Sequence, residues 1–134
     1  MSITADDIRE AIGDHSLWRI PLAGANLKGV NLAGADLRGV DLSYAYLLGG
    51  VFCGADLRGA NLSKAELSEA VLCGADLRGA FLQDANLTDA DLTGAQMDGA
   101  NLTNATLHGT NFTGASGLGS RITLFGVLKE SPDE

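Results

Sequence analysis

Hydrophobic residues recur along this chain at every fifth position. From Leu22 to Phe112, nineteen consecutive sites hold Leu, Phe or Met, and a small residue stands two positions before most of them. Asp or Asn often lies between the two, and Gly often follows two positions after the large residue. A period of five would spiral around every face of an α-helix and would alternate between the faces of a continuous strand. Each pentapeptide is therefore predicted to form a short extended side and a corner, at which Gly supplies backbone freedom.

A second period indicates how many sides complete one turn. The hexapeptide at 34–39 recurs unchanged at 54–59 and 74–79, a spacing of 20 residues. Four pentapeptides therefore form one coil, and equivalent residues of successive coils should stack about 4.8 Å apart. Nineteen sides give about five coils and a solenoid roughly 23 Å long.

The large residues are predicted to stack in four columns that fill the lumen of this solenoid. Phe52, the largest of them in the middle of the chain, follows Gly50 at the small-residue site, which indicates volume compensation. The predicted core includes Leu37, Phe52, Leu57, Leu77, Met97 and Phe112.

Residues 20–115 resemble the pentapeptide-repeat family. The family consensus A-(D/N)-L-X-X is matched by Ala35-Asp36-Leu37-Arg38-Gly39 and by most neighbouring pentapeptides. The resemblance implies an all-β fold, a right-handed quadrilateral parallel β-helix, with Leu or Phe and the preceding Ala packed inside. Three segments are therefore expected: a cap at 1–19, the β-helix at 20–115 and a terminal segment at 116–134.

The segment before the repeats is predicted to contain a short helix that covers the first coil. Thr4 and Asp7 have the spacing of a capping box, and Ile8, Ala11 and Ile12 form one apolar stripe. The alternative is an amphipathic helix that binds a partner.

The segment after the repeats contains an apolar run, Ile122 to Leu128, close to the open end of the solenoid. It is expected to form a degenerate coil or to fold across that end, with a polar tail at 129–134. Since apolar residues at an open end also suit a dimer contact, and gyrase-binding members of the family pair through their C-termini, a homodimer through this segment is the further expectation.

Composition and charge narrow the function classes. The chain has 134 residues, a formal net charge of −8 and only 5% aromatic residues. A single domain is expected, and direct binding to nucleic-acid phosphates is not. No apolar run has the length of a membrane span, and the first residues lack the pattern of a signal peptide, so a cytoplasmic protein without membrane contact is expected.

Residue types that carry out catalysis or bind metals are explained here by the repeat. Asp36, Asp56 and Asp76 should stack beside Arg38, Arg58 and Arg78 as a salt-bridged surface ladder rather than as an acid–base pair. Cys53 and Cys73 should also stack, but parallel side chains are poorly oriented for a disulfide, so free thiols are expected. A redox or metal role is the alternative, although both histidines lie elsewhere. No catalytic residue, cofactor or metal site is predicted.

Five apolar residues occupy outward positions that the repeat otherwise gives to polar residues: Tyr46, Leu48, Val51, Val71 and Phe81. Val51 and Val71 share one side with the two cysteines. Exposed apolar strips often mark partner contacts, so these residues are the candidate contact set, although packing between β-branched neighbours is the alternative explanation.

Two functions follow as hypotheses. The first is a non-enzymatic scaffold or regulator that binds a protein partner, since a solenoid offers flat, regular sides with little concavity. The alternative, from the resemblance, is a DNA mimic that modulates DNA gyrase, as quinolone-resistance members of the family do. Against it stand about half the coils of a typical member of that branch, the arginine ladder, and an acidic band with one residue on each side: Asp84, Asp89, Asp91 and Asp98.

Overall fold

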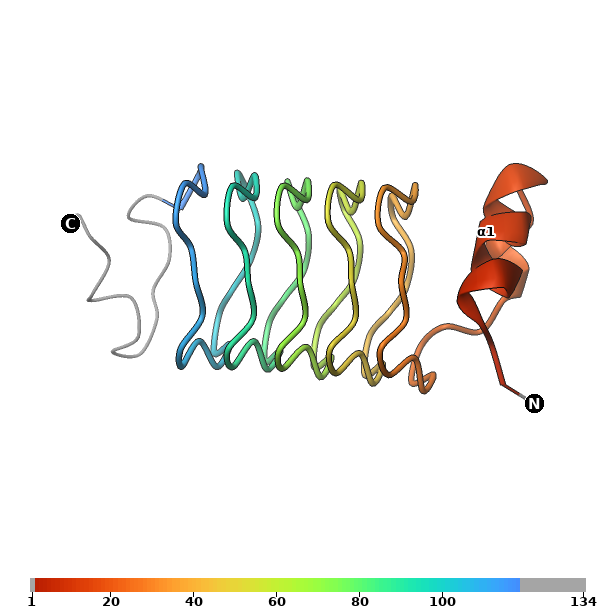
Figure 1. Cartoon of the computed structure of the whole chain (residues 1–134), viewed down its shortest axis with the longest axis horizontal. Coiled ribbons are helices and arrows are strands. Elements are labelled where there is room, and N and C mark those ends of the chain that lie inside the picture. Colours follow the sequence, from red (N-terminus) through yellow and green to blue (C-terminus); the bar gives the residue numbers. More distant parts are fainter. Residues whose placement is uncertain (1, 119–134) are drawn as a thin grey trace.

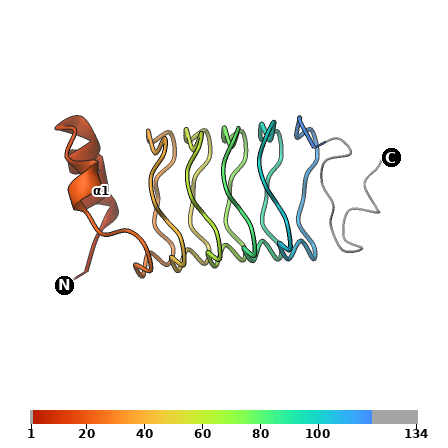
Figure 2. The same cartoon turned by 180° about the vertical axis from the view of Figure 1, so that it is seen from behind.

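The protein is a single solenoid with a helix at its N-terminal end (Figure 1). The computed structural model describes residues 2–118. The helix α1 (Ala5–Gly13) and the short 3-10 helix η1 (Leu17–Arg19) come first, and stacked coils follow. Seen from behind, α1 lies across the end of the stack (Figure 2). No helix in this part of the chain has the length and apolar character needed to cross a membrane.

The predicted capping box of α1 is confirmed. The Thr4 hydroxyl accepts a hydrogen bond from the Asp7 N–H at 3.1 Å, and the Thr4 N–H donates to the Asp7 carboxylate at 2.9 Å. Ile8 and Ala11 are buried, and Ile12 packs beside them against the first coil. The helix thus covers the open end of the lumen with the apolar stripe that its sequence predicts.

The coil of four pentapeptides is also confirmed. Parallel β-bridges join each outward residue to the one 20 positions later, from Asn26↔Tyr46 to Gln96↔Ser116. Each side contributes a single bridged residue rather than an extended strand, because a corner follows after five residues. Most corners hold Gly at positive φ, such as Gly54 at 68°. The right-handed sense of the coil stays a prediction.

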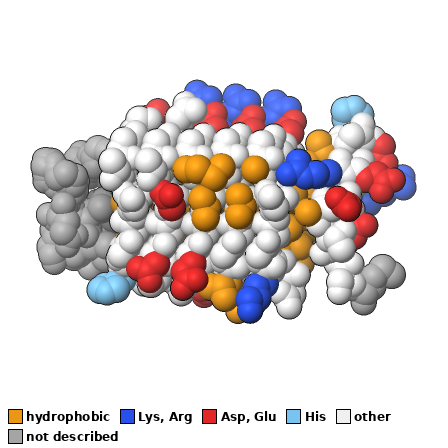
Figure 3. All heavy atoms as spheres, viewed as in Figure 1, with side chains coloured by type: hydrophobic (Ala, Val, Ile, Leu, Met, Phe, Trp, Pro, Cys, Tyr) orange, Lys and Arg blue, Asp and Glu red, His pale blue; other side chains and the backbone are white. Residues whose placement is uncertain are grey.

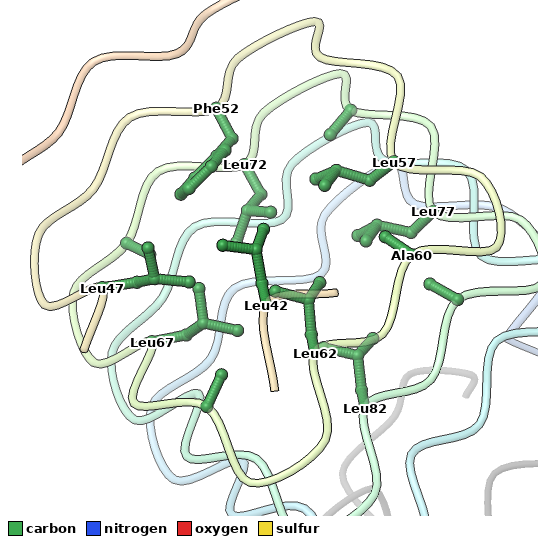
Figure 4. Close-up of a cluster of buried hydrophobic side chains, with 14 of the residues drawn as sticks. Leu42, Leu47, Phe52, Leu57, Ala60, Leu62, Leu67, Leu72, Leu77 and Leu82 are labelled. Atoms are coloured by element: carbon green, nitrogen blue, oxygen red, sulfur yellow. The ribbon is translucent and has the colours of Figure 1, made fainter. Parts of the chain in front are cut away.

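The lumen is filled by the large residues of the repeat (Figure 4). Leu57 and Leu77 lie one over the other in successive coils (Figure 4). The bridges Asp36↔Asp56 and Asp56↔Asp76 place Leu37 in the same column, and all three leucines are fully buried. Phe52 and Met97 are buried as well. Phe112 is only partly buried because it lies in the last described coil, where no further coil covers it within the described residues. The expected contact through the C-terminal segment falls on residues 119–134, outside the described residues.

Candidate partner-binding surface

One side of the solenoid carries an apolar patch between polar neighbours. Val51 and Val71 form a parallel bridge, and Cys53 and Cys73 stand beside them in the same two coils. We call these four residues the cysteine patch; all four are half-buried. Figure 3 shows hydrophobic side chains gathered near the middle of this side, below the row of basic side chains.

Charged groups border the cysteine patch along the solenoid axis. On the N-terminal side, the guanidinium of Arg9, a residue of α1, donates hydrogen bonds to two main-chain oxygens of the preceding coil, that of Ala33 at 3.0 Å and that of Asn31 at 3.3 Å. In the following coil, Asp91 accepts hydrogen bonds from the hydroxyl and the main-chain N–H of Thr93, which lower the pKa of the carboxyl. An apolar centre with a charged rim is the usual composition of a protein-binding surface.

The expectation of free thiols is wrong. Cys53 and Cys73 form a disulfide, and their Cα atoms lie 4.7 Å apart, within the usual range for such a bond. The two residues hold the same position in consecutive coils, so translation along the axis alone brings them this close. Parallel Cα–Cβ directions do not prevent the bond, because rotation about each Cα–Cβ bond turns the sulfur toward its neighbour.

The structure separates the other predicted contact residues from the cysteine patch. Tyr46 bridges Asn26 and Glu66 on the preceding side, where the half-buried Leu48 also lies. Phe81 bridges Asn61 and Asn101 on a third side. Tyr46 and Phe81 are exposed, but each stands among polar residues. The five candidates thus fall on three sides: Val51 and Val71 in the cysteine patch, Tyr46 and Leu48 on the preceding side, and Phe81 on a third.

Two exposed aromatic residues were not predicted as contact residues from the sequence. Trp18, in η1, has 78% of its surface exposed, and Tyr44, at a corner, has 64%. A cation stacks on each ring: the Arg19 guanidinium lies 5.1 Å from the Trp18 ring centre, and the Lys64 ammonium lies 5.5 Å from that of Tyr44. A signal for Tyr44 was present in the repeat, since an aromatic residue replaces the Gly expected at that corner.

The predicted ladder of ion pairs is confirmed on the side that follows the cysteine patch. Each carboxylate pairs with the arginine two residues later, at 2.6 Å for Asp36–Arg38, 2.7 Å for Asp56–Arg58 and 2.6 Å for Asp76–Arg78. The hydrogen bonds from Arg38 lower the pKa of Asp36 to about 2. Within residues 2–118, no three His, Cys, Asp or Glu side chains are grouped to hold a metal ion.

Comparisons with known proteins agree with this architecture. A model of eight pentapeptide repeats matches residues 22–59, 52–89 and 82–116. The crystal structure of HetL from the cyanobacterium Nostoc sp. strain PCC 7120, a pentapeptide repeat protein involved in the regulation of heterocyst differentiation, matches with 36% identity and a TM-score of 0.57. The match covers 69% of this chain and 48% of HetL, so the chain spans about half the length of that protein.

Two further solved structures show weaker similarity. Rfr23, a pentapeptide repeat protein from the cyanobacterium Cyanothece 51142, is 29% identical over 77% of this chain and 97% of its own, with a TM-score of 0.43. QnrB1, a plasmid-mediated fluoroquinolone resistance protein, is 18% identical over 71% of this chain and 64% of its own, with a TM-score of 0.40. A comparison with curated protein sequences gave no match.

Proposed function

Since the chain belongs to the pentapeptide-repeat family, we propose that it is a non-enzymatic regulator that binds a protein partner through the cysteine patch. The observation that carries this proposal is the apolar patch itself. Val51, Val71 and the disulfide lie side by side on a flat side of the solenoid, where the repeat otherwise places Asn, Asp and Thr.

Binding suits this surface better than catalysis does. The patch holds no titratable side chain, because the disulfide removes both thiols. The carboxylate at its rim, Asp91, is hydrogen-bonded to Thr93 and has a lowered pKa, which disfavours proton transfer near neutral pH. The half-buried valines, by contrast, offer apolar surface that a partner can cover.

Similarity to HetL supports a regulatory role. HetL takes part in the regulation of heterocyst differentiation, and this chain matches it at 36% identity over about half of its length. For the DNA-mimic alternative, similarity to QnrB1 at 18% identity indicates the fold alone. The pairing of Asp36, Asp56 and Asp76 with arginines also leaves no row of unpaired carboxylates on that side.

Affinity capture from the native host, with matched baits, tests the proposal. Val71→Lys places a charge in the patch, and Asn61→Lys places the same charge at the equivalent, half-buried bridge position of another side. We expect the wild-type and Asn61→Lys baits to recover the same partner, and Val71→Lys to recover at least about tenfold less of it. Equal recovery by all three baits, at equal thermal stability, would contradict the proposal.

A further inference from the structure

The N-terminal cap covers the edge of the first coil unevenly. On the side of the cysteine patch, the Arg9 guanidinium donates to the oxygens of Asn31 and Ala33, where the N–H groups of a preceding coil would otherwise lie. On the Asp/Arg side, no group within residues 2–118 donates to the main-chain oxygens of Asp36 or Arg38, and none accepts from the Asp36 N–H. An unpaired strand edge is therefore left open there.

The residues that would complete this side of the coil are present but turn away. Leu17 and Trp18 stand 20 positions before Leu37 and Arg38, which is the spacing of one coil. They lie in η1 instead, where the N–H of Ile20 donates to the oxygen of Leu17 at 3.0 Å. The Leu17 oxygen thus takes part in a 3-10 turn, and no main-chain group of Leu17 or Trp18 forms a hydrogen bond with the edge.

Two hollows adjoin the open edge. One, of about 460 Å³, is lined by Trp18, Ile20, Val40 and Arg38 among others. The other, of about 390 Å³, is lined by Ile12, Leu17, Trp18, Asp36 and Arg38 among others. Trp18 lies between them and is the most exposed large hydrophobic residue of the described chain. The edge is therefore bordered by apolar surface that a ligand can cover.

The ladder of ion pairs is incomplete at the same edge. Asp56 lies near Arg58 and near Arg38 of the preceding coil, at 3.7 Å, and Asp76 likewise lies 3.6 Å from the preceding Arg58. Within residues 2–118, Asp36 forms an ion pair only with its own Arg38. The exposed fraction of the side chain accordingly rises from 16% for Asp76 and 29% for Asp56 to 46% for Asp36. One position for a basic group, on the outer side of Asp36, is unfilled.

From these observations we infer that the open edge at 36–38, together with Trp18, binds an extended segment of a protein partner by strand addition. Residues of the segment follow the order polar, apolar, basic. The polar residue pairs with the main chain of Asp36, the apolar side chain enters the hollow beside Ile12 and Leu17, and the Arg or Lys contacts the Asp36 carboxylate. Main-chain hydrogen bonds and alternating side-chain sites are the general means by which sheet edges recognise peptides. The inference does not depend on the cysteine patch.

A synthetic peptide with the sequence pattern of the repeat tests it. The probe is acetyl-Gly-Ala-Thr-Leu-Arg-Gly-amide, in which Thr replaces the Asp of the hexapeptide at 34–39 to avoid a second carboxylate beside Asp36. The control peptide has Glu in place of Arg. Binding is followed by the fluorescence of Trp18, the single tryptophan, and by the NMR shifts of the Asp36 and Arg38 amides. Asp36→Asn is the test variant, and Asp76→Asn, in the same ladder two coils away, is its matched control.

We expect a saturable fluorescence change with the Arg peptide and amide shifts confined to the first coil and η1. The Glu peptide should bind at least about tenfold more weakly, and Asp36→Asn should weaken the Arg peptide about threefold while Asp76→Asn leaves it unchanged. The inference is overturned by the absence of saturation at millimolar peptide, by equal binding of the two peptides, or by shifts at the cysteine patch. Concentration-dependent dimerisation that changes Trp18 fluorescence without peptide would also overturn it, since a second copy would then occupy the edge.

Discussion

Gly50 is the position at which the close packing of the lumen can be tested most directly. A Cβ atom added there would lie 2.9 Å from Cε2 of the Phe52 ring and 3.1 Å from the main-chain oxygen of Leu47. Neither neighbour can move freely, because Phe52 is fully buried and Leu47 belongs to the coil backbone. Most of the equivalent sites hold Ala, such as the fully buried Ala45 and Ala55.

An extra methyl or larger group forced into a filled core typically lowers the free energy of unfolding by about 1–3 kcal/mol. We expect Gly50→Ala to lower the free energy of unfolding by about 1–2 kcal/mol and Gly50→Val, with two more methyl groups, by about 3 kcal/mol. For a chain of this length, each kcal/mol corresponds to roughly 3–6 °C in the melting temperature.

A double-mutant cycle, measured by urea unfolding, tests whether the loss of stability in Gly50→Ala comes from the contact with the Phe52 ring. Phe52→Leu removes the contact and restores the Ala-X-Leu pattern when combined with Gly50→Ala. The double variant should therefore be more stable than the sum of the single changes by about 1 kcal/mol or more. Gly13→Ala is the matched control, since an added Cβ there has no neighbour within 4 Å. An unchanged midpoint for Gly50→Ala, or strictly additive effects, would refute volume compensation.

Four further outcomes are expected. Reduction of the Cys53–Cys73 disulfide, which spans 20 residues, should lower the free energy of unfolding by about 3 kcal/mol, whereas the double Cys→Ser variant should not respond to reductant. Alkylation at the moment of lysis should leave Cys53 and Cys73 unmodified because the disulfide protects both sulfurs, whereas modification of both would show that the bond is absent in the cell. The pKa of Asp36 is lowered from 3.8 to about 2, so its contribution to stability is present above about pH 4 and is lost as the pH falls toward 2. In the Asp36→Asn variant, the denaturant concentration at the midpoint of unfolding should therefore depend less on pH between about pH 4 and 2. Purified DNA gyrase should supercoil plasmid at the same rate with and without micromolar protein, and inhibition would favour the DNA-mimic alternative.

Features that depend on the repeat alone could be predicted from the sequence. The five-residue and 20-residue periods determine which residues enter the lumen and which stack, and the burial of Leu37, Leu57 and Leu77 and the pairing of Asp36 with Arg38 follow from them. The disulfide was missed because stacking determines the distance between Cα atoms but not the side-chain rotamers.

Features at the ends of the repeat could not be predicted in the same way. Leu17 and Trp18 keep the spacing of a coil, yet they form η1, where the Ile20 N–H donates to the Leu17 oxygen, and they leave the edge at Asp36 unpaired. The exposure of Trp18 and the open edge at Asp36 both result from that local choice. The period indicates where a coil would continue but not where it ends.

Some residues that depart from the repeat are explained by packing in the lumen, whereas others lower the stability of the fold without a packing gain. Residues of the second kind are candidates for a functional role. Gly50 opposite Phe52 keeps the lumen filled, so its departure is explained by packing. Tyr44 is different: it adopts φ of 62°, a conformation that costs a non-glycine residue about 1 kcal/mol, while the residue is 64% exposed and the Lys64 ammonium stacks on its ring. Lys64, Asp84 and Asn104 adopt the same conformation at the equivalent corners of the following coils; the short polar side chains of Asp and Asn tolerate it more readily, whereas Lys64 shares the cost with Tyr44. An aromatic residue held there at a cost, without a packing gain, is a contact candidate of the same kind as Trp18, on a side of the solenoid that the cysteine patch does not reach.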